Sequence, residues 1–165
     1  MAYAGDRDGA FAILDQTRTW LPHSGQHNTR GSWFMLALVI EGLVMLGERS
    51  QVGELYPLVG ELLDTGAVAL WPIPRSTHTI AGIAAAAARQ WRAAEDHFGI
   101  ALQHAEAFPQ RLEPAEIRRF HAMMLIDRAA PGDLDEARTL LSEALNSYAQ
   151  IGMPRHIEIV RALLS

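Results

Sequence analysis

One pattern of small and large apolar residues, which occurs twice at helical spacing, constrains the fold of this chain more than any other feature. Each copy has an alanine, a large apolar residue four positions later, a second alanine three positions after that, and then leucine. The copies are Ala94, Phe98, Ala101 and Leu102, and Ala137, Leu141, Ala144 and Leu145. On a helix these positions form one stripe, in which the small residues let a partner helix approach and the large residue fills the remaining space. The pattern therefore predicts two similar helices, each packed closely against a neighbour.

Looser copies of the stripe extend the pattern towards the N-terminus. They are carried by Arg7, Ala10 and Leu14, and by Val52, Leu55 and Val59. Taken from residues 7, 52, 91 and 134, the spacings between successive copies are 45, 39 and 43 residues. A repeat of about this length is typical of a helical hairpin, and hairpins that cannot bury both faces alone stack on one another. We therefore expect antiparallel helical hairpins stacked as an α-solenoid.

The spacing of apolar residues in the rest of the chain also favours helices. Such residues recur every three or four positions, and no stretch shows the alternation of a half-buried strand. The sequence thus predicts an all-α fold of about seven or eight helices. The expected helices cover residues 5–20, 32–47, 51–64, 76–89, 91–107, 114–128, 133–151 and 154–164. Prolines mark breaks at 71–74 and 131–133, and Asp133 is expected to cap the helix that follows.

Residues in two of the expected helices resemble a known helical repeat. Gly82, Trp91, Ala94, Phe98 and Ala101 follow the order of the tetratricopeptide pattern, which has a small residue on its first helix and A-x3-F-x2-A on its second. The units here are longer than the 34 residues of that repeat.

Four segments, 54–59, 79–86, 130–133 and 151–156, together resemble the C-terminal helical-repeat region of bacterial class III adenylate or guanylate cyclases and of large ATPase-type transcriptional regulators. The resemblance implies a single tetratricopeptide-like domain over the whole chain, with catalysis and ATP binding in other domains. Its implied units are residues 1–31, 32–74, 75–112 and 113–153, with a capping helix over 154–165.

Two residue types are missing from the sequence, and this excludes several kinds of chemistry. There is no cysteine, which excludes disulfides, cysteine-bound metals and thiol nucleophiles. There is also no lysine, which excludes a phosphate-binding-loop lysine and Schiff-base chemistry within this chain. No catalytic motif is recognisable either, so we expect no enzymatic activity and no cofactor.

Two pairs of histidines stand at helical spacing. His23 and His27 are four residues apart, and His97 and His104 are seven apart. The first pair lies in a loop, where helical spacing has no meaning, and neither pair has a convincing third ligand nearby. The sequence therefore predicts no metal site.

Charge and hydropathy limit the partners of the chain. The net charge is −5 and the arginines are scattered among carboxylates, which argues against nucleic acid. The longest apolar run, Trp33 to Leu46, has about 14 residues where roughly 20 are needed to cross a bilayer. The first residues also lack the apolar core of a secretory signal. We expect a cytoplasmic protein whose partner is another protein or a second copy, with no membrane contact.

The first helix of each hairpin lines a concave surface in the repeats that this chain resembles, and this rule selects candidate partner-binding residues. They are Arg75, His78, Thr79 and Ile83 in one unit, and Arg118, Arg119 and His121 in the next. Together these groups could hold an acidic peptide or a carboxylate. The alternative, which we favour, is a solvated helix face with pairs within the helix such as Glu116–Arg119.

The N-terminal end is the expected place of self-association. Its stripe of Ala10, Ile13, Leu14 and Thr17 lacks a partner helix and a polar cap. The C-terminal end differs, because a last helix can close it with Ile157, Val160, Ala162 and Leu163. We expect a dimer, with a contact near Phe11, Leu14, Trp33 or Leu36.

These inferences favour one function and leave one alternative. The favoured function is a non-catalytic protein–protein interaction or scaffolding module of a cytoplasmic bacterial signalling protein. The alternative is a small-molecule-binding sensor domain, with a pocket between hairpin helices where the small residues Ala84–Ala88 leave space.

Overall fold

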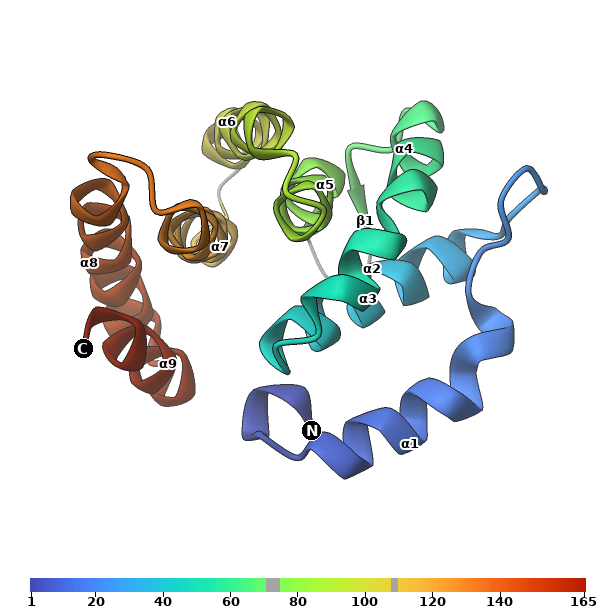
Figure 1. Ribbon diagram of the computed structural model, residues 1–165, viewed down its shortest axis with the longest axis horizontal. Coiled ribbons are helices and arrows are strands. Elements are labelled where there is room, and N and C mark those ends of the chain that lie inside the picture. The colour runs from blue at the N-terminus through green and yellow to red at the C-terminus, as the bar shows by residue number, and fades with distance from the viewer. Residues whose placement is uncertain (71–74, 108–109) are drawn as a thin grey trace.

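The computed structural model describes residues 1–70, 75–107 and 110–165, and over them the all-α fold is confirmed (Figure 1). This part of the chain forms nine α-helices: α1 (Arg7–Thr17), α2 (Arg30–Met45), α3 (Arg49–Glu54), α4 (Tyr56–Asp64), α5 (Thr77–Ala87), α6 (Trp91–Ala107), α7 (Glu113–Arg128), α8 (Asp133–Ile151) and α9 (Pro154–Leu164). The short 3-10 helices η1 (Ala2–Ala4) and η2 (Arg18–Trp20) flank α1. Strand β1 (Ala69–Leu70) pairs antiparallel with β2 (Arg75–Ser76).

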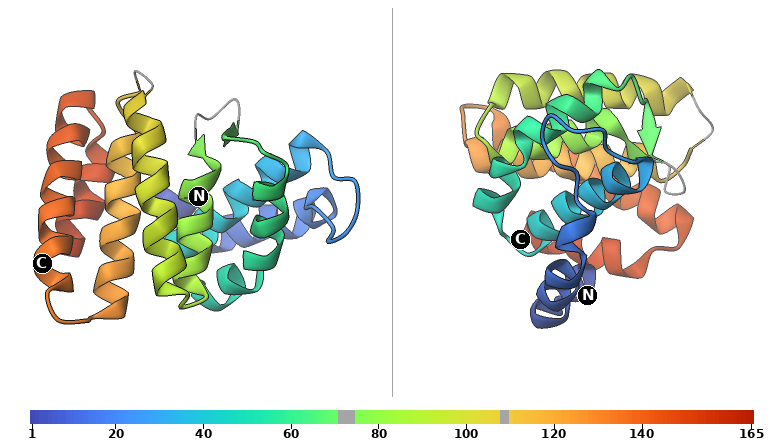
Figure 2. Two further views of the ribbon diagram at one scale, coloured as in Figure 1. Left: turned by 90° about the horizontal axis from the view of Figure 1, so that it is seen from above. Right: turned by 90° about the vertical axis from the view of Figure 1, so that its right-hand side faces the viewer.

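Helices that follow one another along the chain are neighbours in space from α4 to α9. Helix α5 packs on α4 and α6, α7 packs on α6 and α8, and α9 packs on α8. The row of helices bends into an arch, and η1 and α1 lie on its inner side (Figures 1 and 2). Helix η1 contacts α2, and Arg155 at the start of α9 donates a hydrogen bond of 2.6 Å to the carbonyl oxygen of Tyr3. The N-terminal segment therefore contacts both α2 and the last helix, α9.

The duplicated stripe is buried as predicted. Ala94, Ala101 and Ala144 are 0% exposed and Ala137 is 1% exposed. On α6 the aromatic ring of the stripe, Phe98, packs directly on Gly82 of α5, where an added β-carbon would lie 2.6 Å from a ring carbon. The close approach of α5 and α6 therefore depends on a residue without a side chain at position 82.

Three local expectations were wrong. The expected helix 51–64 is two helices, because Pro57 in the first turn of α4 has no N–H to bond the preceding turn. The expected helix 5–20 is α1 with a 3-10 helix on each side. Asp133 is not a cap but the first residue of α8, where its carboxylate pairs with Arg128 at 2.8 Å and accepts the N–H of Ala130 at 2.7 Å. The β1–β2 pair was not expected, and the proline-rich break at 71–74 lies outside the described residues.

The two ends of the arch differ in packing. At the C-terminal end Val160 of α9 is buried and Ile157 and Leu163 pack against the core, whereas Ala162 is exposed. At the N-terminal end no residue of α1, all of which the structure describes, is buried. Within the described ranges, none of the helices combines the length and the apolar character that crossing a membrane requires.

Candidate functional site

A buried network of charged side chains lies where η1, α2, β2, α7 and α8 meet. At its centre are Glu116 and Arg119, one turn apart on α7, and a hydrogen bond of 2.7 Å joins Arg119 Nη2 to Glu116 Oε2. Arg119 is 0% exposed and Glu116 is 1% exposed. A buried charge costs several kcal/mol unless it is paired and hydrogen-bonded, so the groups around this pair decide whether it is tolerated.

A second buried guanidinium, Arg75 of β2, links three carboxylates. Its Nε donates to Glu41 of α2 at 3.1 Å, its Nη1 to Glu113 at 2.7 Å and its Nη2 to Glu116 at 3.3 Å. Arg75 therefore ties α2 and the short β-hairpin to the first turn of α7.

Two tyrosines complete what we call the buried ion network (Tyr3, Glu41, Arg75, Glu113, Glu116, Arg119 and Tyr148). The hydroxyl of Tyr3 donates to Glu41 at 2.5 Å and accepts from Arg119 Nη2 at 2.8 Å. The hydroxyl of Tyr148 donates to Glu116 and accepts from Arg119 Nε at 3.3 Å. Each phenol thus bridges a carboxylate and a guanidinium, which spreads the buried charge over several elements.

The carboxyl groups of the network differ in how easily they take up a proton. Burial disfavours ionisation of Glu116, but the guanidinium groups of Arg119 and Arg75 outweigh it and lower its pKa to about 2. Burial raises the pKa of Glu113 above its ordinary value, and Arg75 offsets this only in part. Burial also lowers the pKa of His156, whose Nε2 lies 3.6 Å from Glu116 Oε1. Glu116 is thus the fixed negative charge of the network.

Four residues that were expected to face a groove are instead buried. Arg75, Thr79, Ile83 and Arg119 are 7%, 0%, 2% and 0% exposed. The two guanidinium groups already hold carboxylates of the same chain, so in this arrangement they offer no free face to an acidic peptide. The expected Glu116–Arg119 pair is present, but it lies in the interior and not on a solvated face. The face of α7 that carries Arg119 is therefore neither a groove surface nor a solvated surface, because η1 and α8 cover it.

The other three expected groove residues, His78, Arg118 and His121, are partly exposed and have separate surroundings. Arg118 pairs with Glu143 of α8 at 2.6 Å. The ring of His121 stacks on that of Phe98, with centroids 5.3 Å apart, and its buried Nε2 has no hydrogen-bond partner among the described residues. His78 faces α6. The structure therefore does not bring the seven residues together as one surface.

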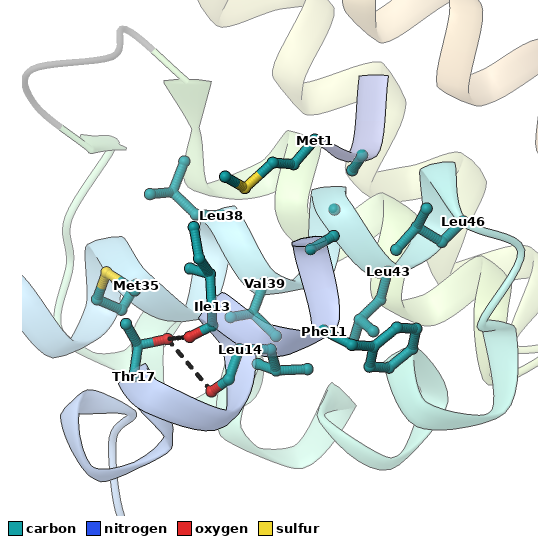
Figure 3. Close-up of a pocket in the computed structure, with 13 residues that line it drawn as sticks. Met1, Phe11, Ile13, Leu14, Thr17, Met35, Leu38, Val39, Leu43 and Leu46 are labelled. Carbon is teal, nitrogen blue, oxygen red and sulfur yellow. Dashed lines mark hydrogen bonds between the residues drawn. The ribbon is translucent and has the colours of Figure 1, made fainter. Parts of the chain in front are cut away.

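An apolar cleft, which we call the α1–α2 cleft, separates α1 from α2 (Figure 3). Its volume is about 200 Å³. At its mouth the side chains of Met1, Ile13 and Leu38 are 56%, 41% and 40% exposed. Its lining consists of Met1, Ala2, Ala10, Phe11, Ile13, Leu14, Thr17, Met35, Leu38, Val39, Gly42, Leu43 and Leu46.

The expected self-association residues divide between this cleft and the core. Phe11 and Leu14 line the cleft. Trp33 and Leu36 are 9% and 0% exposed and do not line the cleft, which corrects the expectation that they lie near the same contact. The reason is that α2 has two apolar faces: the face with Trp33 and Leu36 packs into the core, and the face with Leu38 turns to α1.

A second, more polar depression lies beside the end of α5, and we call it the α5 hollow. Its volume is about 540 Å³. It is lined by Arg49, Ser50, Gly53, Glu54, Ala86, Ala87, Ala88, Arg89, Trp91 and Asp127. Arg49 and Asp127 form an ion pair within this lining. The sequence placed a pocket around Ala84–Ala88, and the hollow includes the last three of these residues, whereas Ala84 and Ala85 are 0% exposed.

Five residues of the buried ion network or its surroundings were not identified from the sequence as candidate site residues: Tyr3, Glu41, Glu113, Tyr148 and His156. Two of them carry a signal. Glu41 interrupts the apolar run of α2, and Tyr148 continues the stripe of α8 four residues after its second alanine. Tyr3 and His156 have no local signal in the sequence, because their partners are distant along the chain. Glu41 and Glu116 lie 38 and 113 residues from Tyr3, and Glu116 lies about forty residues from His156.

Comparison with protein-family models, with curated proteins and with solved structures finds no match for this chain. Over the part of the chain that the structure describes, no group of three or more histidine, aspartate or glutamate side chains is arranged to hold a metal ion. The candidate site is therefore defined by the geometry of the two depressions and of the buried ion network.

Proposed function

We propose that this protein is a non-catalytic, tetratricopeptide-like interaction module of a cytoplasmic bacterial signalling protein, and that it binds a second copy of itself through the α1–α2 cleft. The cleft is the observation that carries the proposal. Helix α1 rests on α2 without burying any of its residues, and about 200 Å³ between them is unfilled. Unfilled apolar space costs packing energy, so apolar side chains of a partner that enter it are favoured.

The charge of the cleft suits a second copy. The chain carries −5, so two copies repel each other at long range and associate best through a surface that adds no further charge. None of the residues that line the cleft has a charged side chain. Ile13 and Leu38 come from the two helices of the cleft and are both exposed, so each is available to a second copy, and in a two-fold contact every pair that they form occurs twice.

The buried ion network supports a structural role in this module. Its arginines and carboxylates are paired with one another, and Tyr3 joins η1 to α2 and α7 through hydrogen bonds of 2.5 Å and 2.8 Å. The network therefore fixes η1, the segment directly before α1, and keeps the cleft in a defined shape. Groups that are saturated with partners of the same chain leave little for substrate chemistry.

The test is the molar mass in solution, measured by light scattering behind gel filtration at high micromolar concentration. The parent chain is expected to be a dimer. Ile13→Glu, at a position 41% exposed in the cleft, should give monomers, because it places a charge in an apolar contact. Leu134→Glu, at a position 52% exposed on α8, is the matched control and should remain a dimer. A monomeric parent, or a dimer that survives Ile13→Glu, contradicts the proposal.

A second candidate function, small-molecule sensing, is favoured by the α5 hollow. Its volume of about 540 Å³ lies within the range of ligand pockets, and its lining combines the guanidinium of Arg89 with the indole of Trp91. These two groups suit an aromatic carboxylate. Benzoate, titrated to about 10 mM and followed by amide NMR shifts, should perturb residues of α3 and the end of α5 in the parent but not in Arg89→Ala. Shifts absent in the parent, or unchanged in the variant, contradict this candidate.

A further inference from the structure

A pair of histidine rings meets between α5 and α6, away from the buried ion network. The Nδ1 atoms of His78 and His97 lie 3.1 Å apart, and the ring centroids are 5.3 Å apart. Both side chains are partly buried, and each stands on a helix that packs extensively against the other. The packing of two helices thus fixes the separation of the two nitrogens.

This separation is what two ligands of one metal ion require. Zinc–nitrogen bonds are about 2.0–2.1 Å long, and two such bonds span 3.1 Å when they meet at about 95–102°. That angle lies between the ideal values for square and tetrahedral coordination. At this separation both nitrogens can bind one ion once the rings turn, so that their lone pairs converge on it and no longer point at each other as in the hydrogen bond.

The ionisation of the two rings is also suitable. Burial lowers the pKa of His78 and of His97, and nearby His97 and His104 lower that of His78 further. Only a neutral imidazole binds a metal ion, and burial favours the neutral form of both rings. In the metal-free protein one ring donates its Nδ1 proton to the other. When an ion binds, that proton moves to Nε2 of the same ring, so no proton is released overall.

We propose that His78 and His97 form a two-histidine binding site for a divalent transition-metal ion of the Zn²⁺, Ni²⁺ or Cu²⁺ class, which joins α5 to α6. Imidazole ligands without thiolate or carboxylate select this class of ion over Mg²⁺ or Ca²⁺. No third side chain among the described residues converges on the same point, so water completes the coordination. The closest further ring is that of His104, whose centroid lies 5.6 Å from that of His78 and whose buried Nδ1 has no partner within the described ranges.

The site goes beyond the proposed interaction function and is tested separately from it. ZnCl₂ is titrated into the full chain at pH 7.5, and binding is followed by calorimetry and by the ¹⁵N shifts of the histidine rings. One Zn²⁺ per chain is expected to bind in the micromolar range and to shift the Nδ1 resonances of His78 and His97. Because the chain has no cysteine, no thiol competes for the ion.

Variants identify the ligands. His78→Gln and His97→Gln should each weaken binding at least tenfold. His23→Gln and His27→Gln, in the exposed loop before α2, are the matched controls and should leave it unchanged. Circular dichroism of each variant checks that the fold is retained. The proposal is overturned if Zn²⁺ leaves both Nδ1 resonances of the parent unmoved, or if the loop variants abolish binding while His97→Gln does not.

Discussion

At the scale of the single residue, Gly82 shows how one missing side chain sets the distance between two helices. An added methyl group would lie 2.6 Å from a ring carbon of Phe98, so Gly82→Ala forces the ring or the helix to move. We expect it to destabilise the protein by about 1–3 kcal/mol, although alanine is the better helix former. Urea denaturation measures this.

Gly99 on α6 provides the control for that change. It is an exposed helical glycine, and apart from its chain neighbours and the backbone of its own helix no atom lies within 4 Å of an added β-carbon. Gly99→Ala should therefore stabilise the protein by up to about 1 kcal/mol through helix propensity alone. If Gly82→Ala stabilised the protein to the same extent, the close contact with Phe98 would be refuted. In a Phe98→Leu background the cost of Gly82→Ala should fall, because the ring that it meets is gone.

Glu116 gives a prediction for the acid range. Its folded pKa is about 2 against 4.5 for the free side chain, so its ionised form stabilises the fold fully above pH 4.5. This contribution, about 3 kcal/mol, is lost as the pH falls from 4.5 to 2. In the same range Glu116→Gln has no carboxyl to titrate, so its free energy of unfolding should fall by about 3 kcal/mol less than that of the parent.

The control for Glu116→Gln is the exposed ion-pair residue Glu143, whose carboxylate contacts Arg118. Glu143→Gln should follow the parent closely, because exposed ion pairs contribute little. Equal acid slopes for the parent and Glu116→Gln would show that the carboxylate is not stabilised by its guanidinium partners.

The pairing of Glu116 with Arg119 could be predicted from sequence, and its burial could not. Residues three apart on a helix are neighbours, which is local information. Burial depends on Tyr3 and Tyr148, which come from segments more than a hundred and about thirty residues away and cover α7 from two sides. A periodic pattern in α7 itself does not contain this information, because charged residues at such positions are typical of a solvated face.

At the scale of the element, helix bounds were predictable where the backbone has an explicit stop. Helices α6, α8 and α9 begin and end at the expected residues. Gly132 and Gly152, both with positive φ, separate α8 from its neighbours, and Pro154 begins α9. A single helix was expected over 51–64 because the apolar residues keep helical spacing on both sides of Pro57. That spacing gives no sign of the hydrogen bond that is lost where proline has no N–H. Two-residue strands are too short to show any period.

The packing of α8 on α7 gives a prediction at this scale. Ala137 is 1% exposed and lies where the two helices meet, so Ala137→Leu adds three carbon atoms to a filled space. We expect a loss of about 1–3 kcal/mol in the free energy of unfolding. Ala149→Leu, on the exposed face of the same helix, is the matched control and should change it by less than about 0.5 kcal/mol. If both changes have the same small effect, the register of the stripe is wrong.

At the scale of the whole molecule, the all-α class followed from sequence and the position of the N-terminal segment did not. The unpaired stripe on α1 indicated an exposed apolar face, and the α1–α2 cleft contains Phe11 and Leu14 from that stripe. Where α1 lies depends on the placement of η1, which hydrogen bonds of Tyr3 and Arg155 fix across the whole length of the chain. Contacts between residues so far apart in the sequence produce no periodic pattern in it, so they cannot be predicted from the spacing of apolar residues.

Net charge makes the proposed dimer sensitive to salt in one direction. Two copies of charge −5 repel each other, and no side chain that lines the cleft between them is charged, so the contact contains no ion pair between side chains that salt could weaken. The Debye length shortens from about 20–30 Å near 0.01–0.02 M salt to about 8 Å at 0.15 M, so added salt screens the repulsion. We therefore expect the dissociation constant to fall several-fold when NaCl is raised from about 20 to 150 mM. Sedimentation equilibrium at the two salt concentrations measures it. A contact held by ion pairs, such as Arg118 of one copy with Glu143 of the other, would instead weaken as salt is added. A dissociation constant that rises with salt would therefore show that the interface lies outside the cleft.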